Sequence, residues 1–243
     1  MKEGLGGLKD WVEMDGAETA ERASSLWFSP SGSRSLDELL GGGYRAGRVV
    51  EVFGKSNSGK TQIAMQAALY SSIKGRRTLF IDTEGSFRPE RIAEIAAARG
   101  LTKSVVLESI VYLRATTMAE QEEAVMRAAE RELTSECELV IVDSLTKNFT
   151  LELPGNANLA NRQGALGVHL SRMARDAIVN ERAYLVTNRV TFGSRSEVEI
   201  GGKTVDQLVH GSLWLERSGG SLRATDTRTG KIASLSLGIA GVE

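Results

Sequence analysis

The sequence predicts an α/β fold in which helices flank a mostly parallel central sheet, with antiparallel strands towards the C-terminus. An apolar run, a glycine-rich loop and a helical pattern follow one another over residues 48–69. Further apolar runs alternate with helix-sized segments as far as residue 189, which favours parallel strands joined by helices. The last apolar runs are separated only by glycine-containing turns, which favours antiparallel pairing. They are Ser212–Arg217, Leu222–Thr225 and Ile232–Leu237.

Composition and charge are those of a globular protein. The 243 residues, 41% hydrophobic and 25% charged, suit one α/β domain. The net charge of -1 gives no general attraction to nucleic acid, so any such contact needs a local patch. The single cysteine, Cys137, excludes an internal disulfide and fits a reducing compartment. Because the chain lacks an apolar signal core and any apolar run near ~18 residues, we expect a cytoplasmic protein without a membrane span.

The glycine-rich loop matches the phosphate-binding P-loop pattern G-x-x-x-x-G-K-[ST]. Its residues are Gly54, Lys55, Ser56, Asn57, Ser58, Gly59, Lys60 and Thr61. The glycines allow a turn that points backbone N–H groups at phosphate oxygens. Lys60 supplies a charge for the β- and γ-phosphates, and the Thr61 hydroxyl can bind Mg²⁺. An apolar strand precedes the loop and a helix follows it, which is the context that the motif requires. The sequence therefore predicts that the chain binds a nucleoside triphosphate.

The first part of the chain is a short polar extension, residues 1–30, and the core is expected to cover residues 31–243. The extension is too short to form a folded module of its own. Within it, Asp10–Ser25 predicts a helix in which Trp11 and Met14 are among the few large apolar residues. Ser33–Leu40 then predicts a short helix that ends at three consecutive glycines.

Acidic residues lie at the ends of two of the expected core strands. Residues 77–84 form an apolar run that ends at Glu84, and residues 139–144 form another that includes Asp143. Because ligands bind beyond the carboxyl ends of strands in an open α/β sheet, both carboxylates are expected at the nucleotide site. An aspartate in this position is the usual Mg²⁺-side partner of a P-loop. Glu84 can also be a solvated strand end without a catalytic role.

Other elements complete the predicted core. Helices are expected over residues 89–99 and 119–133, with a strand at 110–113 between them, a fifth strand at 184–189 and a long loop at 191–204. A loop at 154–161 leads into a long helix. Its apolar stripe, expected to face the sheet, consists of Leu166, Leu170, Met173 and Ala177. His169 and Arg172 lie off this stripe and are expected to be solvated.

Several segments taken together closely resemble archaeal RadA recombinases. They are Ser35–Gly43, Glu51–Gly54, Gly59–Gln62, Phe87–Ile92, Val142–Thr146, Leu159–Ala160 with Arg162–Gln163, and Val186–Asn188. The resemblance extends from about residue 28 to residue 243 and implies a RecA-like P-loop NTPase fold with ATP and Mg²⁺ as ligands. RadA also carries an N-terminal DNA-binding domain, which we do not find here. We therefore expect a core-only RadA paralogue of the RadB or RadC kind.

The resemblance assigns roles that agree with the local chemistry. Lys60 and Thr61 are expected to contact phosphate and Mg²⁺, and Asp143 to hold a water of the Mg²⁺ shell. Glu84 corresponds to the catalytic glutamate that orients and polarises the attacking water. Arg91 corresponds to the arginine that packs on the adenine ring. The remaining nucleotide contacts are expected from the other P-loop residues and from Gln62, Asn188 and Arg189.

Arg189 departs from the family pattern, which has a glutamine after the asparagine of the fifth strand. In the family, this glutamine couples the γ-phosphate to a DNA-binding loop. An arginine can still reach a phosphate, or it can disable the coupling. The sequence leaves both possibilities open.

The resemblance also implies a channel for single-stranded DNA, lined by the loops after the fourth and fifth strands. These loops correspond to residues 150–160 and 190–204. The first lacks the expected basic residue. The second offers Arg195 and Lys203 for phosphates and Phe192 as a stacking face, next to two glutamates. We therefore expect weak, salt-sensitive binding of single-stranded DNA.

Positions linked to subunit contacts differ from the family. RadA subunits join through a Phe-x-x-Ala motif upstream of the core, and the corresponding place here has Trp11 and Met14. Thr116 replaces an interfacial aromatic residue, and residues 226–230 are shorter than the family's ATP-capping segment. We expect a monomer or small oligomer that docks through Trp11 on RadA or another repair protein. Trp11 can instead cover the protein's own core.

Two functional classes follow from these expectations. The first is a slow, DNA-stimulated ATPase that assists recombinational DNA repair. The second is a nucleotide-regulated accessory protein that binds RadA or another repair protein and hydrolyses little ATP itself. A third possibility is a different RecA-fold ATPase of a clock or helicase type. ATPase rates with and without single-stranded DNA separate the first two classes.

Overall fold

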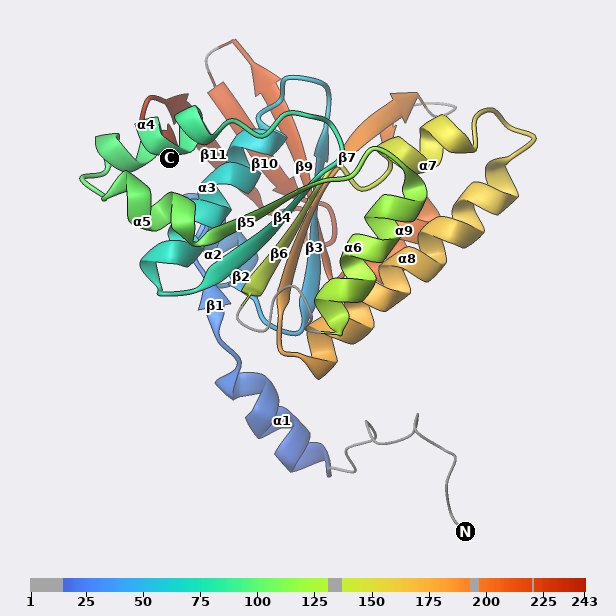
Figure 1. Ribbon diagram of the computed structural model, residues 1–243, viewed down its shortest axis with the longest axis horizontal. Coiled ribbons are helices and arrows are strands. Elements are labelled where there is room, and N and C mark those ends of the chain that lie inside the picture. Colours follow the sequence, from blue (N-terminus) through green and yellow to red (C-terminus); the bar gives the residue numbers. More distant parts are fainter. Residues whose placement is uncertain (1–14, 131–136, 193–196, 220) are drawn as a thin grey trace.

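The computed structural model describes residues 15–130, 137–192, 197–219 and 221–243. Within them, helices lie on both faces of a large central sheet (Figure 1). One face carries α2 (Arg34–Leu40), α3 (Lys60–Ile73), α4 (Pro89–Ala98) and α5 (Lys103–Glu108). The other carries α6 (Met118–Ala129), α8 (Leu159–Val179) and α9 (Lys203–Leu208). No helix of the described residues is long and apolar enough to cross a lipid bilayer.

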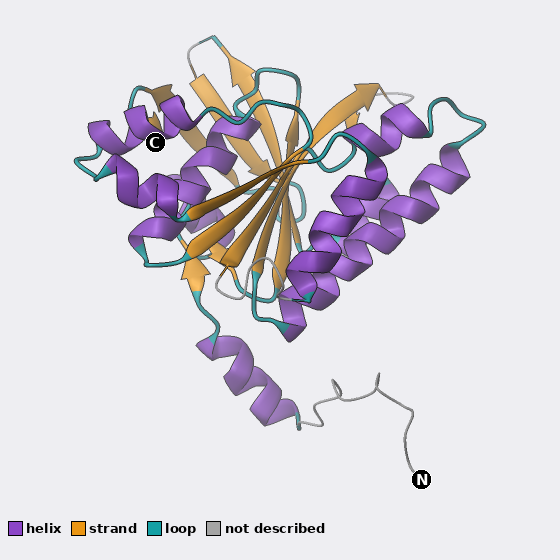
Figure 2. Cartoon of the chain, viewed as in Figure 1, coloured by secondary structure: helices purple, strands orange, loops and turns teal. Residues whose placement is uncertain are grey.

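The large sheet is mixed, as predicted (Figure 2). Its strands in spatial order are β12 (Gly241–Val242), β11 (Ile232–Gly238), β10 (Ser221–Asp226), β9 (Gly211–Ser218), β3 (Arg48–Gly54), β7 (Ala183–Phe192), β6 (Cys137–Asp143), β4 (Arg77–Asp82) and β5 (Ile110–Arg114). The strands from β9 to β5 pair in parallel, whereas β10, β11 and β12 pair antiparallel. The short strand β8 (Glu197–Glu199) pairs antiparallel with β7. A separate two-stranded sheet joins β1 (Phe28–Ser29) to β2 (Tyr44–Arg45).

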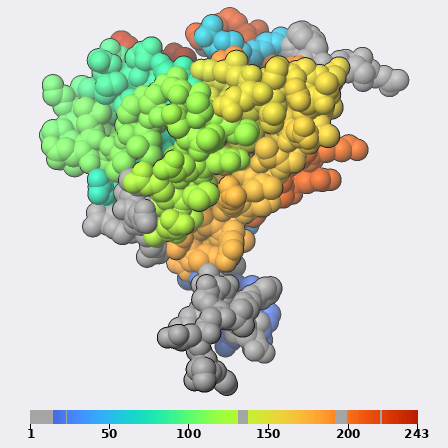
Figure 3. Space-filling model, turned by 45° about the vertical axis from the view of Figure 1, so that its right-hand side comes forward, coloured from blue at the N-terminus to red at the C-terminus, as the bar shows by residue number. Residues whose placement is uncertain are grey.

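Two hydrophobic cores fill the space between the sheet and its helices. In β3, Val50 and Val52 belong to the core under α3, while Val49 belongs to the core under α8. Successive side chains of a strand point to opposite faces, so a continuous apolar run suits a strand that is covered on both sides. The predicted stripe on α8 lies in the second core, which confirms that it faces the sheet. Figure 3 shows the outer surfaces of α6 and α8 next to each other on this face.

Several regions differ from the predicted elements, and the short elements α5, β1, β2 and β12 were not predicted. The first helix, α1 (Gly16–Ser25), begins after Asp15, because the Asp15 carboxylate accepts hydrogen bonds from the N–H groups of residues 17 and 18 and caps the helix there. A short helix that we did not predict, α7 (Lys147–Glu152), follows β6. The segment expected as a loop at 191–204 contains β8 and the start of α9, because Val205 of α9 is buried in the second core.

The prediction that His169 is solvated is wrong. The His169 side chain is buried between α6 and α7, where its Nε2 lies 3.2 Å from the Gln121 amide nitrogen and its ring packs on Phe149. Burial lowers the pKa of His169 to about 3, so the ring is neutral at physiological pH. A stripe defined only by apolar residues misses a polar residue that is buried with a hydrogen-bond partner.

Gln66 of α3 holds segments from both ends of the described core. Its amide nitrogen donates to the carbonyl oxygens of Ser31 and Val242, at 3.0 and 2.9 Å. Its Oε1 accepts the N–H of Val242 at 2.7 Å. Gly241 has no side chain at the point where a Cβ would lie 2.0 Å from this oxygen. The helix that follows the P-loop is therefore tied directly to β12 and to the segment before α2.

Candidate nucleotide-binding site

The carboxyl ends of β3, β4, β6 and β7 meet around a cavity of about 470 Å³. The predicted residues that line it are Ser56, Asn57, Gly59, Lys60, Thr61, Gln62, Glu84, Asp143 and Arg189. Ser86, Ser144, Met65 and Arg217 complete the described lining. The fold thus gathers residues that are up to 161 positions apart (Ser56 to Arg217) at one edge of the sheet.

The P-loop backbone needs its glycines for two reasons. A Cβ on Gly54 would lie 2.2 Å from the carbonyl oxygen of Leu215 in β9, so only glycine fits between the two strands. Gly59 has φ +98°, in the left-handed region, directly before α3 begins at Lys60. The loop therefore delivers the chain into the N-terminus of α3, where unpaired N–H groups favour an anion.

Lys60 lies folded back on its own loop. Its Nζ donates to the carbonyl oxygens of Gly54 and Lys55 at 2.9 and 2.6 Å, and lies 3.4 Å from Ser58 Oγ. Burial lowers the pKa of Lys60 to about 8, opposed by the negative charge of Asp143. A phosphate bound in the cavity would supply the compensating charge for this ammonium group.

Asp143 is buried at the end of β6, where three hydroxyl groups donate to its carboxylate. Thr61 and Ser86 donate to Oδ2 at 2.8 and 2.9 Å, and Thr187 donates to Oδ1. Burial raises the pKa of Asp143 despite these hydrogen bonds. Carboxylate and hydroxyl oxygens are the ligands that Mg²⁺ prefers, and its charge would offset the burial of the carboxylate. The donor set around Thr61 and Asp143 therefore fits Mg²⁺. The peptide bond between Asp143 and Ser144 is cis.

Glu84 follows β4 and lies between two cations. Its Oε2 is 2.5 Å from Arg189 Nη2 and 3.9 Å from Lys147 Nζ, and its Oε1 accepts the Ser144 hydroxyl at 2.9 Å. Glu84 is therefore not the solvated strand end that the sequence allowed. Lys147 and Ser144 were not singled out from the sequence, although both lie within four residues of Asp143.

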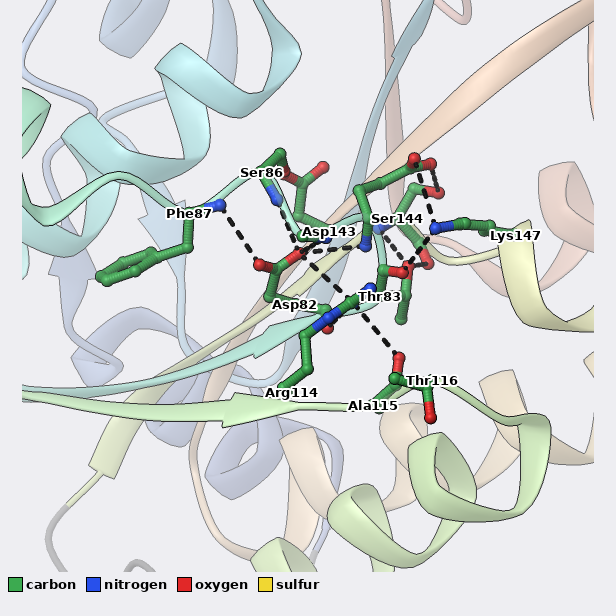
Figure 4. A network of polar contacts seen from close by, with 12 residues as sticks. Asp82, Thr83, Ser86, Phe87, Arg114, Ala115, Thr116, Asp143, Ser144 and Lys147 are labelled. Carbon is green, nitrogen blue, oxygen red and sulfur yellow. Dashed lines mark hydrogen bonds and ion pairs between the residues drawn. The ribbon is translucent and has the colours of Figure 1, made fainter.

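Asp82 shapes the loop that carries Glu84 (Figure 4). Its side chain is 1% exposed. The Asp82 carboxylate accepts the Tyr112 hydroxyl and four backbone N–H groups, from Glu84 (3.0 Å), Gly85 (2.7 Å), Ser86 (3.3 Å) and Phe87 (3.2 Å). Arg114 donates to the Asp82 carbonyl oxygen at 2.6 Å. The sequence signal for this role is an aspartate two residues before the candidate glutamate at a strand end, and our sequence reasoning missed it.

Asn188 is buried and is not among the described residues that line the cavity. Its amide nitrogen donates to Glu51 Oε1 of β3 and to the carbonyl oxygen of Ile200, both at 2.7 Å. Its Oδ1 accepts the Thr146 hydroxyl at 2.6 Å and the N–H of Arg189 at 2.8 Å. Burial raises the pKa of Glu51 to about 7. Asn188 thus connects the strand under the P-loop to the chain beyond β8.

Arg91 of α4 joins the start of α3 to the end of β11. Its guanidinium donates to Gln62 Oε1 at 3.0 Å and to the carbonyl oxygens of Gly238 and Ile239 at 2.6 and 3.1 Å. These contacts fix a flat cation next to Gln62, a residue of the cavity wall. An adenine ring contact by Arg91 stays a prediction.

The candidate DNA and docking residues are only partly described. Trp11, Met14 and Arg195 lie outside the described residues. Phe192 is the last residue of β7, and Lys203 is exposed at the first position of α9. Thr116 is hydrogen-bonded to the Glu120 carboxylate at the start of α6, at 2.8 Å.

Comparison with known proteins shows to which family the chain belongs. The family model for Rad51 matches residues 22–225. The DNA repair and recombination protein RadA of Aeropyrum pernix is 35% identical over 205 residues, which cover 79% of this chain and 64% of the relative. RadA of Metallosphaera sedula is 34% identical over 219 residues, which cover 85% of this chain and 67% of the relative. The chain spans about two thirds of the length of these curated relatives. These matches confirm the resemblance to RadA, and the chain belongs to the Rad51 family.

Proposed function

We propose that this protein binds ATP together with Mg²⁺, hydrolyses the ATP slowly, and assists DNA repair by homologous recombination. One observation carries the proposal: a single cavity gathers the phosphate loop with Lys60, the hydroxyl and carboxylate of Thr61 and Asp143, and the carboxylate of Glu84. These are the groups that phosphoryl transfer needs for positioning and for charge stabilisation. Membership of the Rad51 family supports the proposed setting of DNA repair.

Each residue has a defined task in this proposal. The P-loop N–H groups and Lys60 hold the β- and γ-phosphates, and α3 presents its N-terminus to them. Thr61 and Asp143 hold Mg²⁺, which when bound neutralises charge on the phosphate oxygens. Glu84 orients the water that attacks the γ-phosphorus, so that ADP and inorganic phosphate are the products. Arg91 and Gln62 contact the base.

A second candidate function is that of a nucleotide-regulated accessory protein which binds RadA or another repair protein. The specific observation in its favour is the state of Glu84, whose carboxylate is held by Arg189, Lys147 and Ser144. A glutamate engaged in this way is a poor acceptor for an attacking water. In this case ATP binding controls the conformation of the protein, and Trp11 is the proposed docking residue.

Weak binding of single-stranded DNA is part of the first proposal. The segment 190–204 is the proposed contact, through Phe192, Arg195 and Lys203, and the exposure of Lys203 supports it. Two phosphate contacts would contribute only about 1.4 to the slope of log affinity against log salt concentration, at ~0.7 for each contact on a single strand.

The deciding experiment measures ATP hydrolysis by the purified protein with and without single-stranded DNA. Slow hydrolysis that DNA stimulates supports the first function. ATP binding without measurable hydrolysis in either condition rejects the first function and supports the second. Failure to bind ATP in the presence of Mg²⁺ would reject both.

A further inference from the structure

Arg189 and Glu84 form the closest contact between opposite charges in the described cavity wall. Arg189 Nη2 lies 2.5 Å from Glu84 Oε2, and the Arg189 side chain is 51% exposed, while that of Glu84 is 15% exposed. Charge-assisted hydrogen bonds of this kind are about twice as strong as neutral ones. An attacking water would have to compete with this guanidinium for the Glu84 oxygen.

The Arg189 backbone is fixed at the phosphate end of the cavity. In the parallel pairing of β3 with β7, Arg189 lies opposite Gly54, the first residue of the P-loop. The Arg189 N–H donates to Asn188 Oδ1 at 2.8 Å, and its carbonyl oxygen accepts the N–H of Ile200 at 2.9 Å. Only the half-exposed side chain has to rotate for the guanidinium to reach a different partner in the same cavity.

Lys147, the second cation near Glu84, is held differently. Its Nζ donates to the Thr83 carbonyl oxygen at 2.9 Å and lies 3.9 Å from the Glu84 carboxylate. Lys147 therefore has a fixed backbone partner, whereas the described contacts of the Arg189 guanidinium are to Glu84. A planar guanidinium also binds two phosphate oxygens at once, which an ammonium cannot do with fixed geometry.

We propose that Arg189 is a latch on Glu84: without a triphosphate it holds the carboxylate, and with a triphosphate bound it moves to the terminal phosphate and releases Glu84 to the attacking water. The inference rests on the proposed function, because it assumes that ATP occupies the cavity. It adds a switching role for Arg189 that depends on the third phosphate. ADP has no terminal phosphate at this place, so the latch stays closed with ADP.

The latch makes a prediction about coupling between two residues. Part of the binding energy of a triphosphate is used to break the Arg189–Glu84 pair. The apparent affinity is therefore the intrinsic affinity multiplied by the fraction of protein in which this pair is already broken. Glu84→Gln removes the carboxylate that holds Arg189 and should tighten triphosphate binding severalfold. The same substitution should have little effect when position 189 is glutamine, because no latch is left to open.

The test measures the dissociation constants of ADP and of a non-hydrolysable ATP analogue, both with Mg²⁺, by calorimetry. The proteins are the wild type, Arg189→Gln, Arg189→Lys, Glu84→Gln and the double variant Arg189→Gln/Glu84→Gln. Arg189→Gln should reduce the preference for the triphosphate over ADP by about tenfold or more, the scale of a lost charge-assisted contact. The preference of Arg189→Lys for the triphosphate should lie between those of the wild type and Arg189→Gln. Thermal melting checks that each variant is folded.

Arg22→Gln is the matched control. Arg22 lies on α1, outside the cavity lining, and also pairs with a glutamate, Glu181, at 2.9 Å. This substitution should leave the preference unchanged. The latch proposal is wrong if Arg189→Gln and Arg189→Lys both keep the wild-type preference for the triphosphate. It is also wrong if Glu84→Gln changes triphosphate affinity equally in the wild type and in the Arg189→Gln variant. Neither result would contradict ATP binding itself. If the wild type binds neither nucleotide, the proposed function fails, and the latch fails with it.

Discussion

On the P-loop side of the cavity, Lys60 donates to carbonyl oxygens five and six positions earlier in its own loop. On the opposite side, Glu84 is held by Ser144 and Arg189, which lie 60 and 105 positions away. The first side is specified by a short motif. The second is assembled by the pairing of β4, β6 and β7, whose carboxyl ends supply Glu84, Ser144 and Arg189.

This difference affects which substitutions each side of the cavity can tolerate. A change inside the P-loop would remove the turn, the helix N-terminus or the charge that the loop provides. A change at Arg189 leaves the backbone pairing intact and alters only which group faces Glu84. The P-loop side is therefore expected to retain nucleotide binding, whereas the Glu84 side sets how fast hydrolysis follows.

The largest effect is expected on the P-loop side. Lys60→Ala removes the charge opposite the β- and γ-phosphates and should weaken ATP binding by ~100-fold or more. Calorimetry with ATP and Mg²⁺ measures the effect. Lys74→Ala, at the exposed far end of the same helix, is the control and should bind normally. A folded Lys60→Ala protein with normal ATP affinity would exclude the phosphate-binding assignment.

The next effect is expected on the Glu84 side and in the rate rather than in binding. Glu84→Gln should retain ATP binding while slowing hydrolysis by about 100-fold, the scale of a lost general-base or water-positioning group. Phosphate release under saturating ATP measures it. Glu90→Gln, on an exposed position of α4, controls for the change of charge. A parental rate in the Glu84 variant would show that another group positions the water.

The pH dependence of ATP affinity tests the P-loop side of the cavity without any substitution. The pKa of Lys60 in the free protein is about 8, and a bound phosphate raises it. Below this pH the ammonium is charged in both the free and the bound state. Above it, binding requires uptake of a proton, so ATP affinity should fall by up to ~10-fold per pH unit. Calorimetry at pH 7.5 and 9, in two buffers with different ionisation enthalpies, tests both the affinity and the proton uptake. Equal affinities at the two values would contradict this linkage.

The smallest effect is expected for Asp82, which acts through the loop and not on the nucleotide. Asp82→Asn places an amide opposite N–H donors and should lower the turnover number several-fold, with little change in KM. Steady-state kinetics separates the two quantities. Asp15→Asn is a matched control, because Asp15 also accepts backbone N–H groups but caps α1. A change in KM alone would argue against a positioning role for Asp82.

Much of the fold was predictable because its signals are local. Apolar runs and glycine-containing turns predicted most of the strands, and the P-loop motif predicted the start of α3. The elements that were missed depend on distant partners. Helix α9 exists because Val205 fits the core beside α8, and His169 is buried because Gln121 of α6 meets it there. No periodicity in a single segment carries that information.

The same distinction holds within the site. Lys60, Thr61 and Asp143 were predicted from motifs, and the structure brings them together. The ion pair between Glu84 and Arg189 could not be predicted, since it depends on how two strands separated by β6 are arranged at their ends. Asn188 was expected among the nucleotide contacts, but its buried hydrogen bonds direct it to Glu51 and Ile200.

The contacts of Gln66 have a consequence for hydrogen exchange. Val242 is fully buried and its N–H donates to the Gln66 side chain, so its amide hydrogen is expected to exchange slowly. Its exchange requires either β12 to detach or the P-loop helix to shift. We expect this single amide, observed by NMR, to become more protected when ATP binds at the N-terminus of α3, and so to report occupancy of the cavity through a contact at the middle of that helix.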